Sequence, residues 1–130
     1  MSRAALVLVG LISLYCVGCA TIHPPAISDI REDVVKVEYE VPHGIHMPDS
    51  ETLARATATV ETGSMDIMTA IDAELLATAT AIAQTGCVRY GDRVAEVVST
   101  RCVRFQPGGL FEADICTHKE ALFTCAPSGP

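Results

Sequence analysis

The clearest pattern of hydrophobic and polar positions lies in residues 34–41. Hydrophobic side chains occupy every second position from Val35 to Val41, and charged side chains stand between them, at Lys36, Glu38 and Glu40. A period of two is typical of a strand with one buried face. We therefore expect a strand over 34–41, followed by a loop over 42–48, where two prolines and a glycine interrupt any regular element.

A second pattern, with helical spacing, runs from Ser50 to Thr85. Its recurring positions are Leu53, Val60, Ile67, Ile71, Leu75, Thr78 and Ile82. Asp49 or Ser50 can cap the start, and Gly86 follows where a C-terminal cap belongs. Gly63-Ser64 interrupts the pattern, so the helix is expected to kink or to break into two there. Its many Ala and Thr residues allow close approach of another element, either an intramolecular core or an envelope partner.

The C-terminal third predicts a hairpin. Residues 97–105 are rich in β-branched side chains and end at a turn sequence, Gln106-Pro107-Gly108-Gly109, after which residues 111–116 alternate. This reading places Phe105 opposite Phe111 and Arg104 opposite Glu112, although residues 94–101 are also compatible with a helix. Residues 121–125 add a short edge strand, and residues 126–130 are expected to fray.

Together these elements predict an α+β fold, in which one long helix, whole or broken, packs on a small antiparallel sheet. We expect a single domain over residues 34–125, since a chain of 130 residues is too short for two ordinary domains after removal of a leader. Aromatic residues are only 5% of the chain and Trp is absent, so small side chains must build the core and covalent cross-links gain importance.

The N-terminus has the layout of a signal peptide over residues 1–18. Arg3 precedes an apolar run from Ala4 to Tyr15, which is shorter than the ~20 residues that span a bilayer as a helix. A retained membrane anchor is the less favoured alternative. Residues 19–33 contain Pro24-Pro25 and are expected to form the modified N-terminus and a short tether.

Val17-Gly18-Cys19 resembles the lipobox of bacterial lipoproteins, although Cys16 stands where that motif usually has Leu. The resemblance implies that Cys19 receives diacylglycerol and becomes the N-terminus after cleavage. Because Ala20 follows the acceptor rather than the Asp of inner-membrane retention, it also implies an anchor in the outer membrane, on its periplasmic face. The alternative is cleavage after Ala20 by an ordinary signal peptidase, since Gly18-Cys19-Ala20 also offers small residues.

Four cysteines remain in the mature domain: Cys87, Cys102, Cys116 and Cys125. An even number in an oxidising compartment predicts two disulfides, and the absence of a Cys-x-x-Cys pair disfavours a redox motif or a zinc ribbon. Three connectivities are open. The hairpin favours Cys102 with Cys116, which would leave Cys87 to join Cys125 and tie the helix end to the C-terminus.

The sequence offers little other chemistry. The formal net charge of −7 disfavours nucleic acid as a partner. His43 and His46, with Met47 beside them, form the one loop cluster suited to copper or zinc, but two ligands fall short of a site, and His23 or His118 would have to join them by folding. The favoured interpretation is therefore no metal and no cofactor. Without a nucleophile elbow, a His-Glu-x-x-His helix or a phosphate loop, we expect no catalysis and identify no small-molecule substrate.

The leading functional hypothesis is a non-catalytic outer-membrane lipoprotein that binds or scaffolds an envelope protein complex. A second hypothesis is an envelope sensor that reads the state of its disulfides. A third is a phage- or plasmid-encoded exclusion lipoprotein that blocks a receptor, which fits the small size and the anchor equally well.

Overall fold

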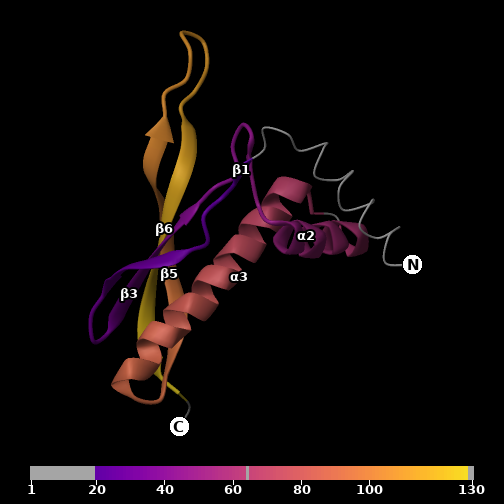
Figure 1. The fold of residues 1–130 in the computed structure, drawn as a ribbon. Helices are drawn as coiled ribbons and strands as arrows, with labels where there is room; N and C mark the ends of the chain where they lie inside the picture. Colours follow the sequence, from indigo (N-terminus) through magenta and orange to yellow (C-terminus); the bar gives the residue numbers. More distant parts are fainter. Residues whose placement is uncertain (1–19, 64, 129–130) are drawn as a thin grey trace, which may run out of the picture.

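The computed structural model describes residues 20–63 and 65–128, and the expected signal peptide and Cys19 lie outside this part of the chain. Figure 1 shows a long helix lying across one face of an antiparallel sheet. The elements are β1 (Ala20–Thr21), β2 (Ala26–Ile30), β3 (Val34–Glu40), β4 (His46–Met47), α2 (Ser50–Thr62), α3 (Ile67–Cys87), a 3-10 turn (Val88–Tyr90), β5 (Arg93–Gln106) and β6 (Ile115–Pro127). The predicted α+β class is confirmed, with α3 as the long helix and α2 as a shorter one before it.

The four-stranded sheet has the order β2-β3-β6-β5, and all its pairings are antiparallel. The alternation in residues 34–41 has its expected cause, since Val35, Val37 and Tyr39 are buried. Across the β3–β6 pair, Val35 lies opposite Phe123 and Val37 opposite Ala121, which are also fully buried. These side chains form the floor on which α3 packs.

Helix α3 approaches the sheet closely because small side chains face it. Asp66 caps its start by accepting a hydrogen bond from the Thr69 N–H at 2.9 Å. Its buried side includes three alanines, Ala70, Ala79 and Ala83, with Ile71 and Leu75 between them. At Gly86 an added Cβ would lie 3.1 Å from Ile30 Cδ1 and 3.3 Å from Val35 Cγ2. Gly86 is therefore a packing position inside the last helical turn, and Val88 is the C-cap.

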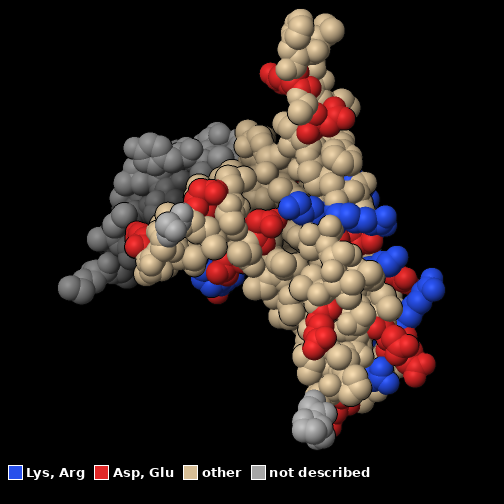
Figure 2. Space-filling view, turned by 180° about the vertical axis from the view of Figure 1, so that it is seen from behind, with Lys and Arg blue, Asp and Glu red and all other residues tan. Residues whose placement is uncertain are grey.

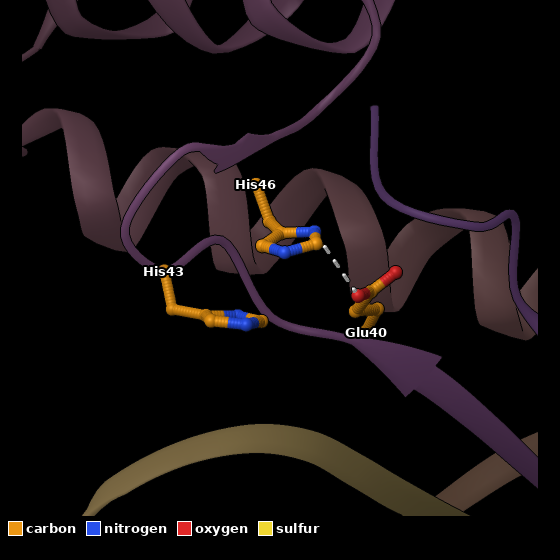
Figure 3. A group of neighbouring side chains, drawn as sticks. All are labelled: Glu40, His43 and His46. Atoms are coloured by element: carbon orange, nitrogen blue, oxygen red, sulfur yellow. Dashed lines mark ion pairs between the residues drawn. The ribbon is translucent and has the colours of Figure 1, made fainter. Parts of the chain in front are cut away.

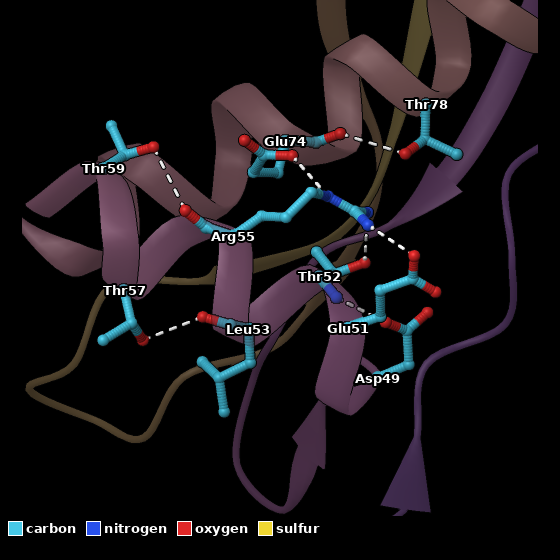
Figure 4. Close-up of polar contacts among 9 residues, drawn as sticks. All are labelled: Asp49, Glu51, Thr52, Leu53, Arg55, Thr57, Thr59, Glu74 and Thr78. Atoms are coloured by element: carbon cyan, nitrogen blue, oxygen red, sulfur yellow. Dashed lines mark hydrogen bonds and ion pairs between the residues drawn. The ribbon is translucent and has the colours of Figure 1, made fainter.

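Helix α2 ends where Gly63 interrupts the pattern, so the expected break occurs there. Asp49 caps α2 through Thr52 N–H at 2.7 Å, and the Arg55 guanidinium joins the two helices by donating to Glu74 Oε2 at 2.9 Å (Figure 4). Arg55 also pairs with Glu51 at 3.0 Å on its own helix. Threonine hydroxyls of α2, such as that of Thr57, donate to carbonyls one turn earlier, which explains how a Thr-rich helix satisfies its polar groups.

Both disulfides form as the hairpin argument favoured: Cys87 bonds Cys125 and Cys102 bonds Cys116. The first joins the end of α3 to β6 across 38 residues, and both of its cysteines are buried. The second closes 14 residues of the β5–β6 hairpin and is half-buried. The domain is therefore cross-linked once through its core and once along its hairpin.

Three local expectations differ from the structure. Residues 20–33, assigned above to a tether, contribute β1 and β2, because Ile22 is buried and Ile27 and Ile30 pack against the core. Phe105 lies opposite Cys116 rather than Phe111, and Arg104 opposite His118 rather than Glu112, because residues 107–114 form a longer loop. Residues 121–125 belong to the continuous inner strand β6, which extends to Pro127, so Ala126 and Pro127 are paired rather than frayed.

Among the described residues, no helix combines the length and the apolar character needed to cross a bilayer.

Candidate functional site

The distal half of the β5–β6 hairpin projects beyond the rest of the sheet (Figure 1). Strand β3 ends at Glu40, which pairs with His118, so the strands beyond that level pair only with each other. The Cys102–Cys116 bond lies near the point where the hairpin leaves the sheet. We call residues 105–115, beyond this bond, the hairpin tip.

The hairpin tip exposes four large apolar side chains. Leu110 is 97% exposed and Phe111 is 99% exposed, and Phe105 and Ile115 at the base of the loop are 59% and 47% exposed. Single exposed apolar residues are ordinary on a protein surface, but a group of them gathered on one projection is a candidate interaction surface. This group was missed by the sequence analysis, which placed Phe111 in a strand.

The loop that carries Leu110 and Phe111 has two hydrogen bonds within it. Asp114 Oδ1 accepts a hydrogen bond from Gly108 N–H at 3.1 Å, and Gly109 O accepts one from Glu112 N–H at 3.1 Å. A Cβ added at Gly108 would collide with the carbonyl oxygens of Glu112 and Ala113. The close chain crossing therefore requires glycine at position 108.

The charge of the hairpin tip is negative. Glu112 and Asp114 lie in it, and no Lys or Arg occurs between positions 105 and 115. In Figure 2 the end of the projection carries acidic side chains, whereas basic ones gather lower, toward the body. The nearest arginine in sequence, Arg104, pairs instead with Glu38 at 3.6 Å. The tip therefore combines an apolar end with an unneutralised acidic flank.

A second cluster of chemically capable side chains lies at the same end of β3, close to the level at which the hairpin leaves the sheet. Glu40, His43 and His46 place their ligand atoms within 4.8 Å of one another, and Figure 3 shows both imidazoles beside the carboxylate. The backbones of His43 and His46 exchange hydrogen bonds of 3.0 and 2.8 Å around a turn in which Gly44 has a φ of +54°. Both rings are thereby held on one side, stacked with centroids 4.7 Å apart.

Glu40 is the buried member of this cluster, with 8% of its side chain exposed. Burial raises the pKa of its carboxyl. The backbone N–H and the ring of His23 reach Oε2 at 2.7 and 3.2 Å, and these contacts and the charge of His118 together lower the pKa by more than burial raises it. The net effect is a pKa below the ordinary value, so the carboxylate is charged at neutral pH. Its other oxygen, Oε1, faces His46 Nδ1 at 3.7 Å.

The chain matches no known family. Scans against protein-family models, curated proteins and solved structures all returned no match. The interpretation of both clusters therefore depends on their geometry and chemistry alone.

The structure brings the two loop histidines of the sequence analysis together with a residue that the analysis missed. Glu40 precedes His43 by three positions, as His43 precedes His46, but a polar residue at a strand end gave no reason to expect burial. His23 reaches the cluster through Glu40, whereas His118 lies opposite Glu40 on β6, with its Nδ1 2.9 Å from the Thr117 hydroxyl. Met47 is exposed.

Two other surfaces are also candidate sites. The outer face of the sheet has a shallow depression of about 280 Å³ lined by Lys36, Ser99, Arg101, Glu120 and Leu122. There Arg101 already pairs with Glu120 at 3.2 Å. The exposed side of α3 is small and uncharged, as a helical docking face requires, at Ala73, Ala77, Ala81 and Thr85. Neither surface identifies an occupant, whereas the hairpin tip does so by shape and charge.

Proposed function

We propose that this protein is a lipid-anchored envelope protein that docks a partner protein through the hairpin tip. The observation that carries the proposal is the nearly complete exposure of Leu110 and Phe111 on a loop with two internal hydrogen bonds. Fully burying two such side chains contributes about 3–6 kcal/mol, enough to dominate an interface of modest size. A preformed loop also loses less conformational entropy on binding than a mobile one.

The chemistry of the partner follows from that of the tip. The two apolar side chains fit a concave apolar pocket, and the acidic flank of Glu112 and Asp114 favours basic residues around its rim. A bilayer is the less suitable occupant, because envelope lipid surfaces are commonly anionic and would repel these carboxylates. The anchor expected at Cys19 would confine the encounter to the membrane surface, which raises the local concentration of both proteins.

The proposal is tested by site-specific photocrosslinking in cells that produce the full-length protein. A photoreactive residue at position 111 is expected to yield one dominant protein adduct. The matched control is position 88 at the C-terminal end of α3, where Val88 is 55% exposed, and it is expected to yield none. Equal adducts from both positions, or no protein adduct at position 111, would overturn the proposal, and adducts to lipid alone would assign the tip to the bilayer.

The lipid anchor is tested separately by the intact mass of the protein extracted from membranes. A mass of Cys19–Pro130 plus lipid, with alkylation of four cysteines only after reduction, is the expected result. A retained leader, or cleavage after Ala20 without lipid, would remove the anchor from the proposal without touching the docking site.

A second candidate function, disulfide sensing, is favoured by one observation. The Cys102–Cys116 bond is half-buried and closes the hairpin that carries the tip, whereas the Cys87–Cys125 bond is buried. Reduction of the accessible bond would loosen the tip and leave the body cross-linked. Selective reduction of Cys102–Cys116 together with loss of partner crosslinking supports this function, and equal resistance of both bonds contradicts it.

A further inference from the structure

A metal site can be built from the cluster at the end of β3. The residues are a buried carboxylate, Glu40, and two loop imidazoles, His43 and His46. Their ligand atoms all lie within 4.8 Å of one another. Carboxylate oxygen with imidazole nitrogen is a donor set that suits Zn²⁺ and Cu²⁺, and two histidines with one carboxylate leave a position open for water.

The spacing of the donor atoms fits a single ion. Zn²⁺ binds imidazole nitrogen and carboxylate oxygen at about 2.0–2.2 Å, so two ligands of one ion lie roughly 3–4 Å apart. Glu40 Oε1 and His46 Nδ1 are 3.7 Å apart, a separation too long for a hydrogen bond and suited to a shared ion. Because the imidazoles stack 4.7 Å apart, the His46 ring must rotate about χ2 for both lone pairs to meet at the ion, since rotation of the His43 ring would break its contact with the Val41 carbonyl.

Neighbouring groups fix the donors in the state that binds a metal. His43 Nδ1 lies 2.6 Å from the carbonyl oxygen of Val41, which can only accept, so the proton is on Nδ1 and the Nε2 lone pair is free. A second bond of this kind is typical of metal-binding histidines. His23 occupies Oε2 of Glu40 in the same way and leaves Oε1 directed to His46. Two of the three donors are thus oriented by partners that lie outside the site.

We propose that Glu40, His43 and His46 bind one divalent transition-metal ion of the zinc and copper class. The ion would clamp the 41–47 loop onto the end of β3. Strand β4 in that loop pairs with β1, and Ile22 N–H donates to Met47 O at 2.9 Å. The site therefore holds the first described residues of the chain against the domain, at a place that neither disulfide reaches.

The test is a calorimetric titration of the purified, disulfide-intact protein with ZnCl₂ and, separately, with CuSO₄ at neutral pH. One saturable site per chain is expected for at least one ion. Glu40→Gln keeps the shape of the side chain and the hydrogen bond from His23 N–H, yet removes the charge, and it should weaken binding more than about 100-fold. His46→Ala should do the same, and His23→Ala, which removes the ring contact with Glu40 Oε2 but keeps the backbone hydrogen bond, should weaken binding by at most about 10-fold.

The matched control is Ile45→Ala, which shortens an exposed side chain of the same loop that carries no ligand atom. Its affinity should stay within about threefold of the unsubstituted protein. Absence of saturable binding for both ions, full affinity in Glu40→Gln, or an equal loss in Ile45→Ala would each overturn the site. Circular dichroism of each variant without metal establishes that it is folded, and none of these substitutions touches the hairpin tip.

Discussion

The base and the tip of the β5–β6 hairpin differ in what surrounds their apolar side chains. At the base, Ala95, Ala121 and Phe123 are buried beneath α3, and Phe123 is fully enclosed. At the tip, Phe111 and Leu110 have almost no contact with the rest of the chain. Burial stabilises a fold only in proportion to the apolar area removed from water. The tip therefore contributes little to the stability of the fold. Its apolar side chains are consistent with the proposed role as a surface that a partner covers.

The two disulfides follow the same division. Cys87–Cys125 crosses the core, whereas Cys102–Cys116 closes a hairpin whose distal half packs on nothing else among the described residues. The first constrains the whole chain between α3 and β6 in the unfolded state, and the second constrains the hairpin that carries the proposed docking surface.

The largest expected effect distinguishes two phenylalanines of the same hairpin. Phe123→Ala should lower the free energy of unfolding by about 3–5 kcal/mol, because it leaves a cavity between α3 and the sheet. Phe111→Ala should change it by less than about 0.5 kcal/mol, since the side chain is already in water. Denaturant unfolding of both variants measures the difference, and similar losses would remove the distinction between base and tip.

Removing each disulfide separates the two regions further. Replacing Cys87 and Cys125 by Ala should cost about 4 kcal/mol, as expected for a loop of this length in the chain-entropy model. Replacing Cys102 and Cys116 should cost less than about 3 kcal/mol, because the tip can open while the body stays folded. Thermal unfolding under non-reducing conditions gives both values. A larger loss for the second pair would place the tip within the cooperative core.

The free energy of unfolding is expected to depend on pH through the buried Tyr39. Burial, and secondarily the charge of Asp72, raises the pKa of Tyr39 to about 12 from 10.0. Since the folded pKa lies above the unfolded one, this contribution is complete below pH 10 and is lost as the pH rises toward 12, by roughly 2–3 kcal/mol. Unfolding measured across this interval should show the slope. Tyr39→Phe should abolish this part of it, and an unchanged slope in that variant would contradict the assignment.

A local effect is expected at Gly108. Gly108→Ala places a methyl group against the carbonyl oxygens of Glu112 and Ala113, so the loop must open. Amide hydrogen exchange should rise in residues 107–114 and stay unchanged in α3, and the melting temperature should move by at most a few degrees. Gly109→Ala is the control, because its nearest contact would be a flexible Glu112 side-chain oxygen at 3.9 Å. Equal exchange in the two variants would show that the loop is not locked.

The features predictable from sequence were those with a local cause. Alternation in β3 follows from one buried face, and the break between α2 and α3 from Gly63. Strand β2 escaped prediction because a bulge between Ile27 and Asp29 disrupts its alternation, so that Ile27 and Ile30 both pack near Gly86. The burial of Glu40 depends on His23, 17 residues away, and no local pattern encodes such a contact.

The most direct measurement of the central claim is the affinity for the partner identified by crosslinking. The variant Leu110→Ser/Phe111→Ser should bind at least about 100-fold more weakly than the unsubstituted protein, because both anchoring side chains are lost. Val88→Ser, which replaces an exposed apolar residue far from the tip in sequence, should bind with unchanged affinity. A change of less than about threefold in the double variant would contradict docking through the tip.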